Sequence, residues 1–480
     1  MTWKVSSAVA DPPGMAGIII LGAGVGGLST AMLLARDGHE ITVLERDPAG
    51  PPPPARAWDS WERRGVNQFR LAHFMLPRWY AQIAADLPDV PAELRAAGAL
   101  STNTLAMLPE ALRGPLRPDD GRFDTVTARR PVLEAVLATV AARTPGVTIR
   151  RGVTVTGLWS DPDQRSGPPH VTGVLVEGGR AVRGDLVVDC GGRRSALGAW
   201  LDAVGARRPV EEREESGFVY YGRHFRGAPP EPRMYVAQHH DSLTVLTLPA
   251  DNGTWSVVLA TSKRDAALRA LRDPHAFDAA LARYPLAAHW RDGEPISGVE
   301  VMAGIEDRYR RLAVDGEPVA TGVVAVGDAW ACTNPTLGRG TSIGLLHARV
   351  LRDVLREVDP QDHDKLARRV DEQTTALVEP LHRMTVWYDR HRLAEIDADI
   401  AGVGYHTDDE RWAISKATFA ASLADPAIAR GYQSLASLLT TPADLYAEPG
   451  MLDRIVELGM RAPRYPLPGP DRRELLAAVG

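Results

Sequence analysis

The sequence of 480 residues predicts an α/β protein, in which a parallel β-sheet domain is interrupted by an antiparallel sheet and followed by a C-terminal helical extension. Three observations lead to this fold class. Short apolar runs, typical of parallel strands buried on both faces, occur at 17–21, 186–188 and 323–326. Between the last two runs, strand-like stretches follow one another without an intervening helix, which is typical of an antiparallel sheet. Beyond residue 368 the pattern is mostly helical.

Residues 16–47 contain the pattern around which the rest of the chain is organised. A strand at 17–21 is followed by a glycine-rich turn, a helix over roughly 25–37 and a second strand at 40–44. Because these features occur in the right order, the segment predicts a Rossmann-like βαβ unit that binds a dinucleotide. An ordinary glycine-rich βαβ turn is the alternative interpretation.

The turn itself reads Gly-Ala-Gly-Val-Gly-Gly over residues 22–27. Glycines at its first, third and sixth positions allow a tight turn, close approach of a pyrophosphate and packing of the helix on the strand. The unpaired N–H groups of the helix favour phosphate. An acid at the end of the second strand can accept hydrogen bonds from both adenosine ribose hydroxyls and would repel a 2′-phosphate. The residues predicted to contact the dinucleotide here are Gly22, Gly24, Gly26, Gly27, Glu45 and Arg46.

The other expected elements follow from apolar periodicity and from turn-forming residues. A polar tail over residues 1–15 precedes the first strand, and a Gly/Pro-rich loop at 161–169 separates two later strands. In the inserted sheet, Asn252-Gly253 is a hairpin-turn signal. The expected helices are 76–87, 127–143 and one starting near residue 341, and the expected strands are 148–158, 171–177, 218–225, 234–237, 243–248 and 255–260.

Composition excludes several classes of function. The net charge is −6 with acids and bases interspersed, so no basic face for nucleic acid is expected. Cys190 and Cys332 lie far apart without metal-type spacing, so neither a disulfide framework nor a metal site is expected. No apolar run is long enough to form a transmembrane segment, and we expect a cytoplasmic protein. The expected domains are 16–205 and 311–390 for the nucleotide-binding part, 206–310 for the inserted sheet and 391–480 for the helical region.

Three nucleotide-type segments recur at distant positions, at 22–27, 189–195 and 327–340. This arrangement resembles the FAD-dependent monooxygenases of the para-hydroxybenzoate hydroxylase superfamily, over about residues 16–360. The resemblance implies a Rossmann-like FAD-binding domain with an inserted antiparallel β-sheet substrate domain. It also implies that one oxygen atom from O₂ is transferred, through a flavin C4a-hydroperoxide, to a hydrophobic organic substrate, with NADPH or NADH as the electron donor.

The same resemblance assigns residues to the FAD. The pyrophosphate lies on the 22–27 turn and the ribose on Glu45, whereas the carboxylate of Asp328 accepts from a ribityl hydroxyl. Residues 335–340 lie against the isoalloxazine, where small residues allow close approach, and the helix that follows stabilises negative charge on reduced flavin. Arg130 would lie near the phosphates, with a surface arginine as the alternative. The further cofactor-binding residues implied are Asp189, Gly327, Pro335, Gly338, Gly340 and Thr341.

A closer likeness rests on residues 68–73, 186–201, 334–338 and 425–445, which are similar to actinobacterial flavoprotein epoxidases of polyether biosynthesis. It implies that Arg70 and His73 line the approach to the flavin, although a satisfied, partly buried histidine is the alternative for His73. For a phenol hydroxylation, Tyr220 or His224 of the inserted sheet are candidate bases. Alternation along the strand places both side chains on one face.

Departures from the aromatic hydroxylases leave the electron donor open. Those enzymes place Asp-Gly together in the middle segment, whereas here Cys190 follows Asp189. Electrons can therefore come directly from NAD(P)H or through a separate flavin reductase. The Trp-x-Trp-x-Ile-Pro element of flavin-dependent halogenases is absent, which disfavours halogenation.

The preferred reaction is epoxidation or hydroxylation in secondary metabolism, and two alternatives share the same cofactor segments. One is a flavin-dependent reductase or dehydrogenase of the geranylgeranyl-reductase type, which would form product without O₂. The other is a non-enzymatic protein, with FAD as a redox sensor or a structural ligand.

Overall fold

The computed structural model describes residues 14–63, 65–160 and 167–480, so most of the expected N-terminal tail and of the 161–169 loop lies outside the described residues. Five parallel strands form the central sheet of a mixed α/β fold, as the sequence predicts. Their spatial order is β20-β9-β1-β2-β5. The strands are β1 (Gly17–Leu21), β2 (Glu40–Glu45), β5 (Val147–Arg151), β9 (Leu186–Asp189) and β20 (Val323–Ala325).

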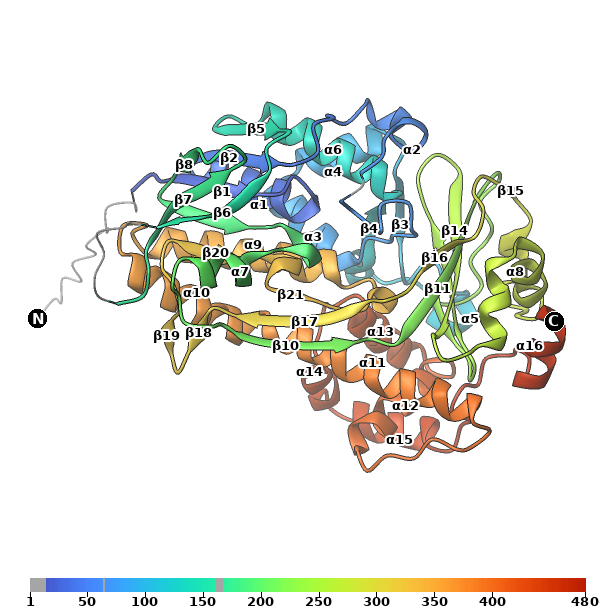
Figure 1. Cartoon of the computed structure of the whole chain (residues 1–480). Coiled ribbons are helices and arrows are strands. Elements are labelled where there is room, and N and C mark those ends of the chain that lie inside the picture. The colour runs from blue at the N-terminus through green and yellow to red at the C-terminus, as the bar shows by residue number, and fades with distance from the viewer. Residues whose placement is uncertain (1–13, 64, 161–166) are drawn as a thin grey trace, which may run out of the picture.

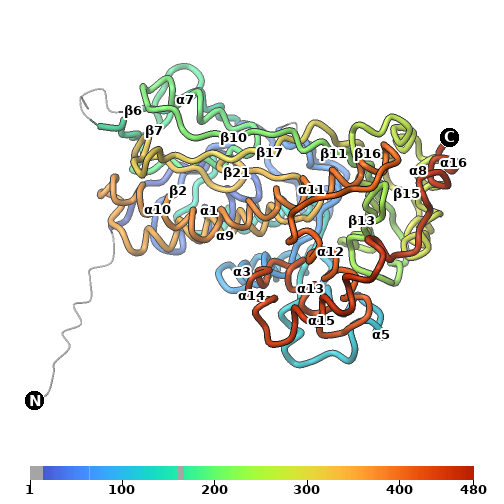
Figure 2. Tube along the Cα trace, turned by 90° about the horizontal axis from the view of Figure 1, so that it is seen from below, coloured from blue at the N-terminus to red at the C-terminus, as the bar shows by residue number. Residues whose placement is uncertain are grey.

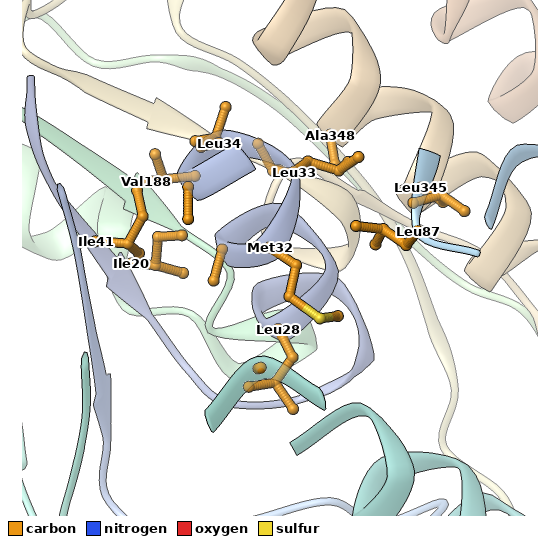
Figure 3. Packing of buried hydrophobic residues seen from close by; sticks show 14 of the residues in the cluster. Ile20, Leu28, Met32, Leu33, Leu34, Ile41, Leu87, Val188, Leu345 and Ala348 are labelled. Atoms are coloured by element: carbon orange, nitrogen blue, oxygen red, sulfur yellow. The ribbon is translucent and has the colours of Figure 1, made fainter. Parts of the chain in front are cut away.

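The parallel sheet is covered on both faces. Helices α1 (Val25–Arg36), α6 (Arg130–Arg143) and α9 (Gly340–Glu357) cover one face, and a three-stranded sheet of β6 (Val155–Ser160), β7 (Val171–Val176) and β8 (Ala181–Arg183) covers the other. Alternate residues of β1 show the layering, since Ile18 and Ile20 pack with the helices while Ile19 packs with β7. Figure 3 shows Ile20 with Ile41 and Val188 on one side of α1, and Ala348 of α9 beside Leu33 on the other side.

An antiparallel sheet forms the other end of the molecule. Its strands are β11 (Phe218–Arg226), β12 (Ala237–His239), β13 (Thr244–Pro249), β14 (Thr254–Ser262), β15 (Glu294–Pro295) and β16 (Glu300–Met302). The predicted hairpin turn is confirmed, with φ of 53° at Asn252 and 65° at Gly253 between β13 and β14. One face of the sheet is covered by α8 (Pro274–Leu281) and α16 (Arg472–Val479), and the other turns toward the parallel domain.

Long strands and the C-terminal helices join the two ends (Figure 1). Strands β10 (Val210–Glu215) and β17 (Glu306–Arg311) run between them, and β21 (Ala331–Cys332) pairs with β17. Figure 2, seen from below, shows the C-terminal helices gathered between the two sheets. These helices are α11 (Glu379–Ile400), α12 (Glu410–Ser422), α13 (Pro426–Ala436), α14 (Pro442–Ala447) and α15 (Met451–Gly459).

Two expected strands differ from the structure. The stretch 148–158 is split between β5 and β6, which belong to different sheets, because Gly152 turns the chain at φ 69°. The strand expected at 234–237 begins only at Ala237, since Tyr235 packs instead against Phe419 and Tyr432 of the C-terminal helices. The remaining elements are α2 (Ala57–Ser60), α3 (Pro77–Asp86), α4 (Asp89–Ala96), β3 (Leu100–Asn103), α5 (Glu110–Arg113), β4 (Asp124–Thr127), α7 (Leu197–Ala203), β18 (Ala313–Val314), β19 (Glu317–Pro318) and α10 (His363–Leu377).

Among the described residues, no helix combines the length and the apolar character that crossing a membrane requires.

Candidate active site

A cavity of about 780 Å³ lies where the parallel sheet, the antiparallel sheet and the C-terminal helices meet. Because β1, β9 and β20 are parallel neighbours, their carboxyl ends share one edge of the sheet, and the three predicted segments that follow them all line this cavity. The predicted convergence of these distant segments is therefore confirmed. Of the predicted cofactor residues, Gly27 alone is absent from the cavity wall; the others that line it are Gly22, Gly24, Gly26, Glu45, Arg46, Arg130, Asp189, Gly327, Asp328, Pro335, Gly338, Gly340 and Thr341.

The glycines of the first turn have different physical roles. Gly22 adopts φ 96°, and a Cβ there would lie 2.9 Å from the carbonyl oxygen of Cys190. A Cβ on Gly27 would overlap the carbonyl oxygen of Gly22, so this glycine lets α1 pack against the turn. A Cβ on Gly24 or Gly26 would meet nothing within 4 Å, and both residues face the cavity.

The N-terminus of α1 is open toward the cavity. Its N-cap, Gly24, provides no side-chain hydrogen bond, and the first turn contains no acidic residue. The free N–H groups and the positive end of the helix dipole therefore suit an anionic group such as a pyrophosphate.

Glu45 lies at the end of β2 within a buried ionic network. Its Oε2 accepts hydrogen bonds from the backbone N–H of Ala23 at 2.8 Å and from Arg63 at 2.5 Å, and its Oε1 accepts from the N–H of Asp47 at 2.9 Å. Arg63 also donates to Glu134 at 2.5 Å. Burial alone would lower the pKa of Arg63, but these two glutamates raise it above its ordinary value. Since a carboxylate can accept about four hydrogen bonds, Glu45 keeps capacity for a ligand hydroxyl.

The two aspartates of the sheet edge differ in their partners. Asp189 accepts from the N–H of Gly191 at 2.8 Å and from the hydroxyl of Ser195, so it shapes its own turn. The carboxylate of Asp328 accepts no hydrogen bond from any residue in the described part of the chain, although it faces the cavity. Burial raises its pKa, an effect that the nearby charges of Arg130 and Arg193 oppose. Asp328 is therefore an acceptor available to a ligand.

Arg130 and His73 form a fixed pair on the cavity wall. Arg130 donates to Glu134 at 2.6 Å and to Nε2 of His73 at 3.0 Å. Since arginine can only donate, Nε2 of His73 is an acceptor, and Nδ1 carries the proton donated to the carbonyl of Leu71 at 3.0 Å. Burial, with a smaller contribution from the charge of Arg130, lowers the pKa of His73 to about 3. His73 is thus a neutral group that orients Arg130.

The third segment presents the start of α9 to the cavity. Residues 335–337 form a 3-10 turn, and Gly338 adopts φ 64° before the helix begins. The helix has no side-chain cap, and the hydroxyls of Thr341 and Ser342 are buried without a hydrogen-bond partner among the described residues. These unsatisfied donors suit a group with carbonyl or ring-nitrogen acceptors.

The far half of the cavity combines aliphatic walls with several polar side chains and is covered on one side by the C-terminal region. One face of the antiparallel sheet supplies aliphatic walls, and α13, which the sequence analysis did not place in the site, supplies the opposite wall. The residues lining this half are Thr104, Tyr220, Gly222, Tyr235, Val236, Ala237, His239, Leu246, Leu248, Val258, Met302, Arg339, Tyr432, Gln433 and Ala436.

The four candidate catalytic residues do not all reach this space. Tyr220 lines the cavity, and its hydroxyl bonds to Asn334 and Thr336 beside the third segment. His224 lies on the same strand face but outside the cavity wall, because its ring packs on Trp58 with centroids 4.7 Å apart. Arg70 also lies outside the wall and donates to the carbonyl oxygens of Trp58 and Trp61. His73 lines the cavity, as described above.

The groups that face the cavity fit a flavin dinucleotide. The uncapped N-termini of α1 and α9 suit a pyrophosphate and other acceptors, and the free space at Gly24 and Gly26 allows a close approach to the backbone. The carboxylate of Asp328 suits a hydroxyl-bearing chain.

Sequence reasoning missed two charged residues of the site. Arg63 lies in the 51–76 segment, which gives no periodic signal, and Arg339 was overlooked although it lies inside a recognised motif.

Comparisons with known proteins agree with this fold. The NAD(P)-binding Rossmann-like domain family matches residues 20–51. Protein Rv3254 of Mycobacterium tuberculosis is 28% identical over 411 residues, covering 78% of this chain and 81% of its own length.

Solved structures of flavoproteins share the architecture. The structure of PqsL, described as a probable FAD-dependent monooxygenase from Pseudomonas aeruginosa, superimposes with a TM-score of 0.59 at 19% identity, covering 81% of this chain and 99% of its own. A single-substitution variant of HpxO from Klebsiella pneumoniae, complexed with FAD, gives 0.57 at 18% identity over 92% and 98% of the two chains. CmlS, a flavin-dependent halogenase, gives 0.57 at 15% identity over 90% and 78%. The chain therefore shares the fold of these proteins, a Rossmann-like domain with several antiparallel sheets and C-terminal helices.

Proposed function

We propose that this protein is an FAD-dependent monooxygenase that inserts one oxygen atom from O₂ into a hydrophobic organic substrate. The observation that carries the proposal is the continuity of the cavity. Its sheet-edge half has the groups that suit a flavin dinucleotide, and aliphatic side chains of the antiparallel sheet line its other half. A cofactor and a substrate could therefore meet in one continuous cavity.

The chain's own residues would hold the FAD along its length. The open end of α1 and Gly24 would bind the pyrophosphate, Glu45 the adenosine ribose and Asp328 a hydroxyl of the ribityl chain. The N-terminus of α9 would lie at the isoalloxazine and stabilise negative charge there. When bound, the flavin supplies the activation of O₂, which no protein side chain provides.

The substrate half is suited to keeping water away from that chemistry. Its aliphatic walls come from β13 and β14, where Leu246, Leu248 and Val258 are each less than 10% exposed. Apolar walls that exclude water protect reactive intermediates from hydrolysis and proton leakage. This property distinguishes a monooxygenase from a flavoprotein that reduces O₂ without oxygenating a substrate.

Epoxidation of an alkene fits this half of the cavity better than hydroxylation of a phenol, because neither Tyr220 nor His239, which line it, is tuned as a base. Burial raises the pKa of Tyr220 well above its ordinary value and lowers the pKa of His239 well below its own. Tyr220 is therefore a neutral phenol at physiological pH. His239 is a neutral imidazole whose ring nitrogens bond to Thr244 and Tyr388 at 3.0 and 3.1 Å.

The proposal is tested in two steps. The purified protein, after incubation with FAD and removal of excess, is expected to be yellow and to retain flavin stoichiometrically. The reduced protein is then mixed with isotopically labelled O₂ and a set of polyenes and phenols, and product mass is measured. Label in the product supports monooxygenation, whereas product formed equally without O₂ would establish the reductase alternative.

The electron donor is tested in the same assay. We propose NADPH or NADH as the ultimate source, used either directly or through a separate flavin reductase. Flavin bleaching by NAD(P)H alone under anaerobic conditions would identify direct use. Bleaching only after addition of a purified flavin reductase would identify the two-component arrangement.

A further inference from the structure

Arg339 is an unpaired cation in the substrate half of the cavity. It lies between Gly338 and α9, lines the cavity and is 8% exposed. Its Nη1 donates to Oγ1 of Thr385 at 3.2 Å, and its Nε is buried without a hydrogen-bond partner among the described residues. Within those residues, no carboxylate lies within the 4.0 Å of an ion pair to Arg339.

Other buried arginines of this chain meet carboxylates. Arg63 contacts both Glu45 and Glu134 at 2.5 Å, and Arg129 contacts Asp251 at 2.7 Å. A guanidinium stays protonated in proteins, so an isolated one in an apolar chamber carries a large desolvation cost. Arg308, which is also buried without an ion-pair partner among the described residues, donates instead to the backbone carbonyls of Gly192, Arg193 and Asp328. Arg339 has only the hydroxyl of Thr385, so an anion entering the cavity would satisfy it.

The neighbouring groups among the described residues form no ion pair with Arg339. Asp389, one helical turn beyond Thr385 on α11, is buried, and both of its carboxylate oxygens make no hydrogen bond within the described structure. Burial, reinforced by the charge of Asp307, raises the pKa of Asp389 well above its ordinary value, against the opposing effects of Asn334 and of Arg339 itself, so burial makes this carboxyl group a poor counter-ion. Tyr432, which also lines the cavity, is neutral because burial raises its pKa.

We propose that Arg339 anchors a carboxylate, or an equally acidic enol, of the substrate, so that the substrate class is an apolar molecule bearing one anionic group. This inference rests on the proposed function and adds the substrate's charge to it. With its anion on Arg339, the apolar body of the substrate extends along β13 and β14, whose side chains form the aliphatic wall. The reacting carbon is then held between the third segment and that wall. Arg339 acts here as a specificity-determining residue.

The test uses a matched pair of probes, 2-naphthylacetate and 2-naphthylacetamide, which differ in charge but hardly in shape. Their binding to the FAD-loaded full chain is measured by isothermal titration calorimetry. The acid is expected to bind roughly ten- to a hundred-fold more tightly than the amide, as befits a charge-assisted hydrogen bond in a buried site. Arg339→Gln is expected to abolish that preference, and Arg339→Lys to restore part of it.

The matched control is Arg369→Gln. Arg369 is a half-buried residue of α10 that is paired with Glu357 and Glu372 and does not line the cavity. This variant changes the net charge equally, and it must keep the preference for the acid. Equal binding of acid and amide by the unaltered protein, or no binding of the acid, overturns the proposal. So does a preference that survives in Arg339→Gln while the reduction potential of the flavin falls, since Arg339 would then serve the flavin.

Failure of the anchor and failure of the monooxygenase proposal are distinguishable. The binding preference requires no turnover and is also measured without flavin, so it stands even if labelled oxygen never reaches a product. Conversely, labelled product from neutral substrates alone, together with equal probe affinities, removes the anchor and leaves the monooxygenase proposal in place.

Discussion

Glycine-to-alanine substitutions in the first turn can separate the role of each glycine in packing from its role in ligand binding. In Gly27→Ala, the new Cβ would lie well inside 3.0 Å of the carbonyl oxygen of Gly22, a backbone atom that cannot rotate away. The helix must shift from the turn, and overpacking of this kind costs about 1–3 kcal/mol, or more where only backbone can yield. In Gly24→Ala and Gly26→Ala, the methyl group meets nothing within 4 Å and projects at the cavity, so the fold should be preserved.

The assay combines differential scanning fluorimetry with retention of FAD after gel filtration. Gly27→Ala should lower the melting temperature by several degrees and lose FAD as a consequence. Gly24→Ala should keep the melting temperature of the flavin-free protein within about a degree and still weaken FAD binding at least about tenfold, because its methyl group occupies the approach of the pyrophosphate. Unchanged FAD affinity in Gly24→Ala, or an unchanged melting temperature in Gly27→Ala, would refute this assignment of roles.

Three further predictions concern single side chains. Asp328→Asn should weaken FAD binding roughly tenfold, as measured by equilibrium dialysis, because it removes the charge of a carboxylate that accepts no hydrogen bond from any described residue. Equal affinity in the two proteins would exclude a ligand role for Asp328. Tyr220→Phe should cost about 1–2 kcal/mol in urea unfolding, since the acceptor of Asn334 and the hydroxyl of Thr336 lose a buried partner; a loss below the error of the measurement would contradict this. Burial, aided by the charge of Arg129, lowers the pKa of His224 from 6.5 to about 3, so the unfolded state binds the proton more readily and stability falls as pH drops below 6.5. His224→Leu should remove about 2 kcal/mol of that loss near pH 5, which urea unfolding at two pH values measures. If the free energy of unfolding changes equally with pH in both proteins, His224 does not contribute.

The nucleotide-binding half was predictable because its signals are local. A strand, a turn with positive φ at Gly22 and an uncapped helix leave a pattern within about 30 consecutive residues. Parallel strands then bring such turns to one sheet edge, so the convergence of 22–27, 189–195 and 327–340 follows from topology.

The substrate half was predictable only in part. Strand alternation correctly places Tyr220 and His224 on one face of β11, but it gives no information on what covers that face. Trp58, from the segment after β2, packs on His224 and separates it from the cavity. Such a contact joins residues 166 positions apart in the chain, and no local pattern encodes it.

The C-terminal helices are part of the site rather than an appendage to it. Tyr432 and Gln433 of α13 form cavity wall, and Gln433 donates to Oγ1 of Thr104 at 2.8 Å, in the segment that follows β3. On the same helix, Arg430 is paired with the buried Asp120 at 2.9 Å. Removing one partner from a buried pair of this kind leaves an uncompensated charge, so the helix is held where it closes the cavity. This wall of the cavity is therefore held by contacts between residues more than 300 positions apart, which explains why sequence reasoning predicted the sheet-edge half and not the wall opposite it.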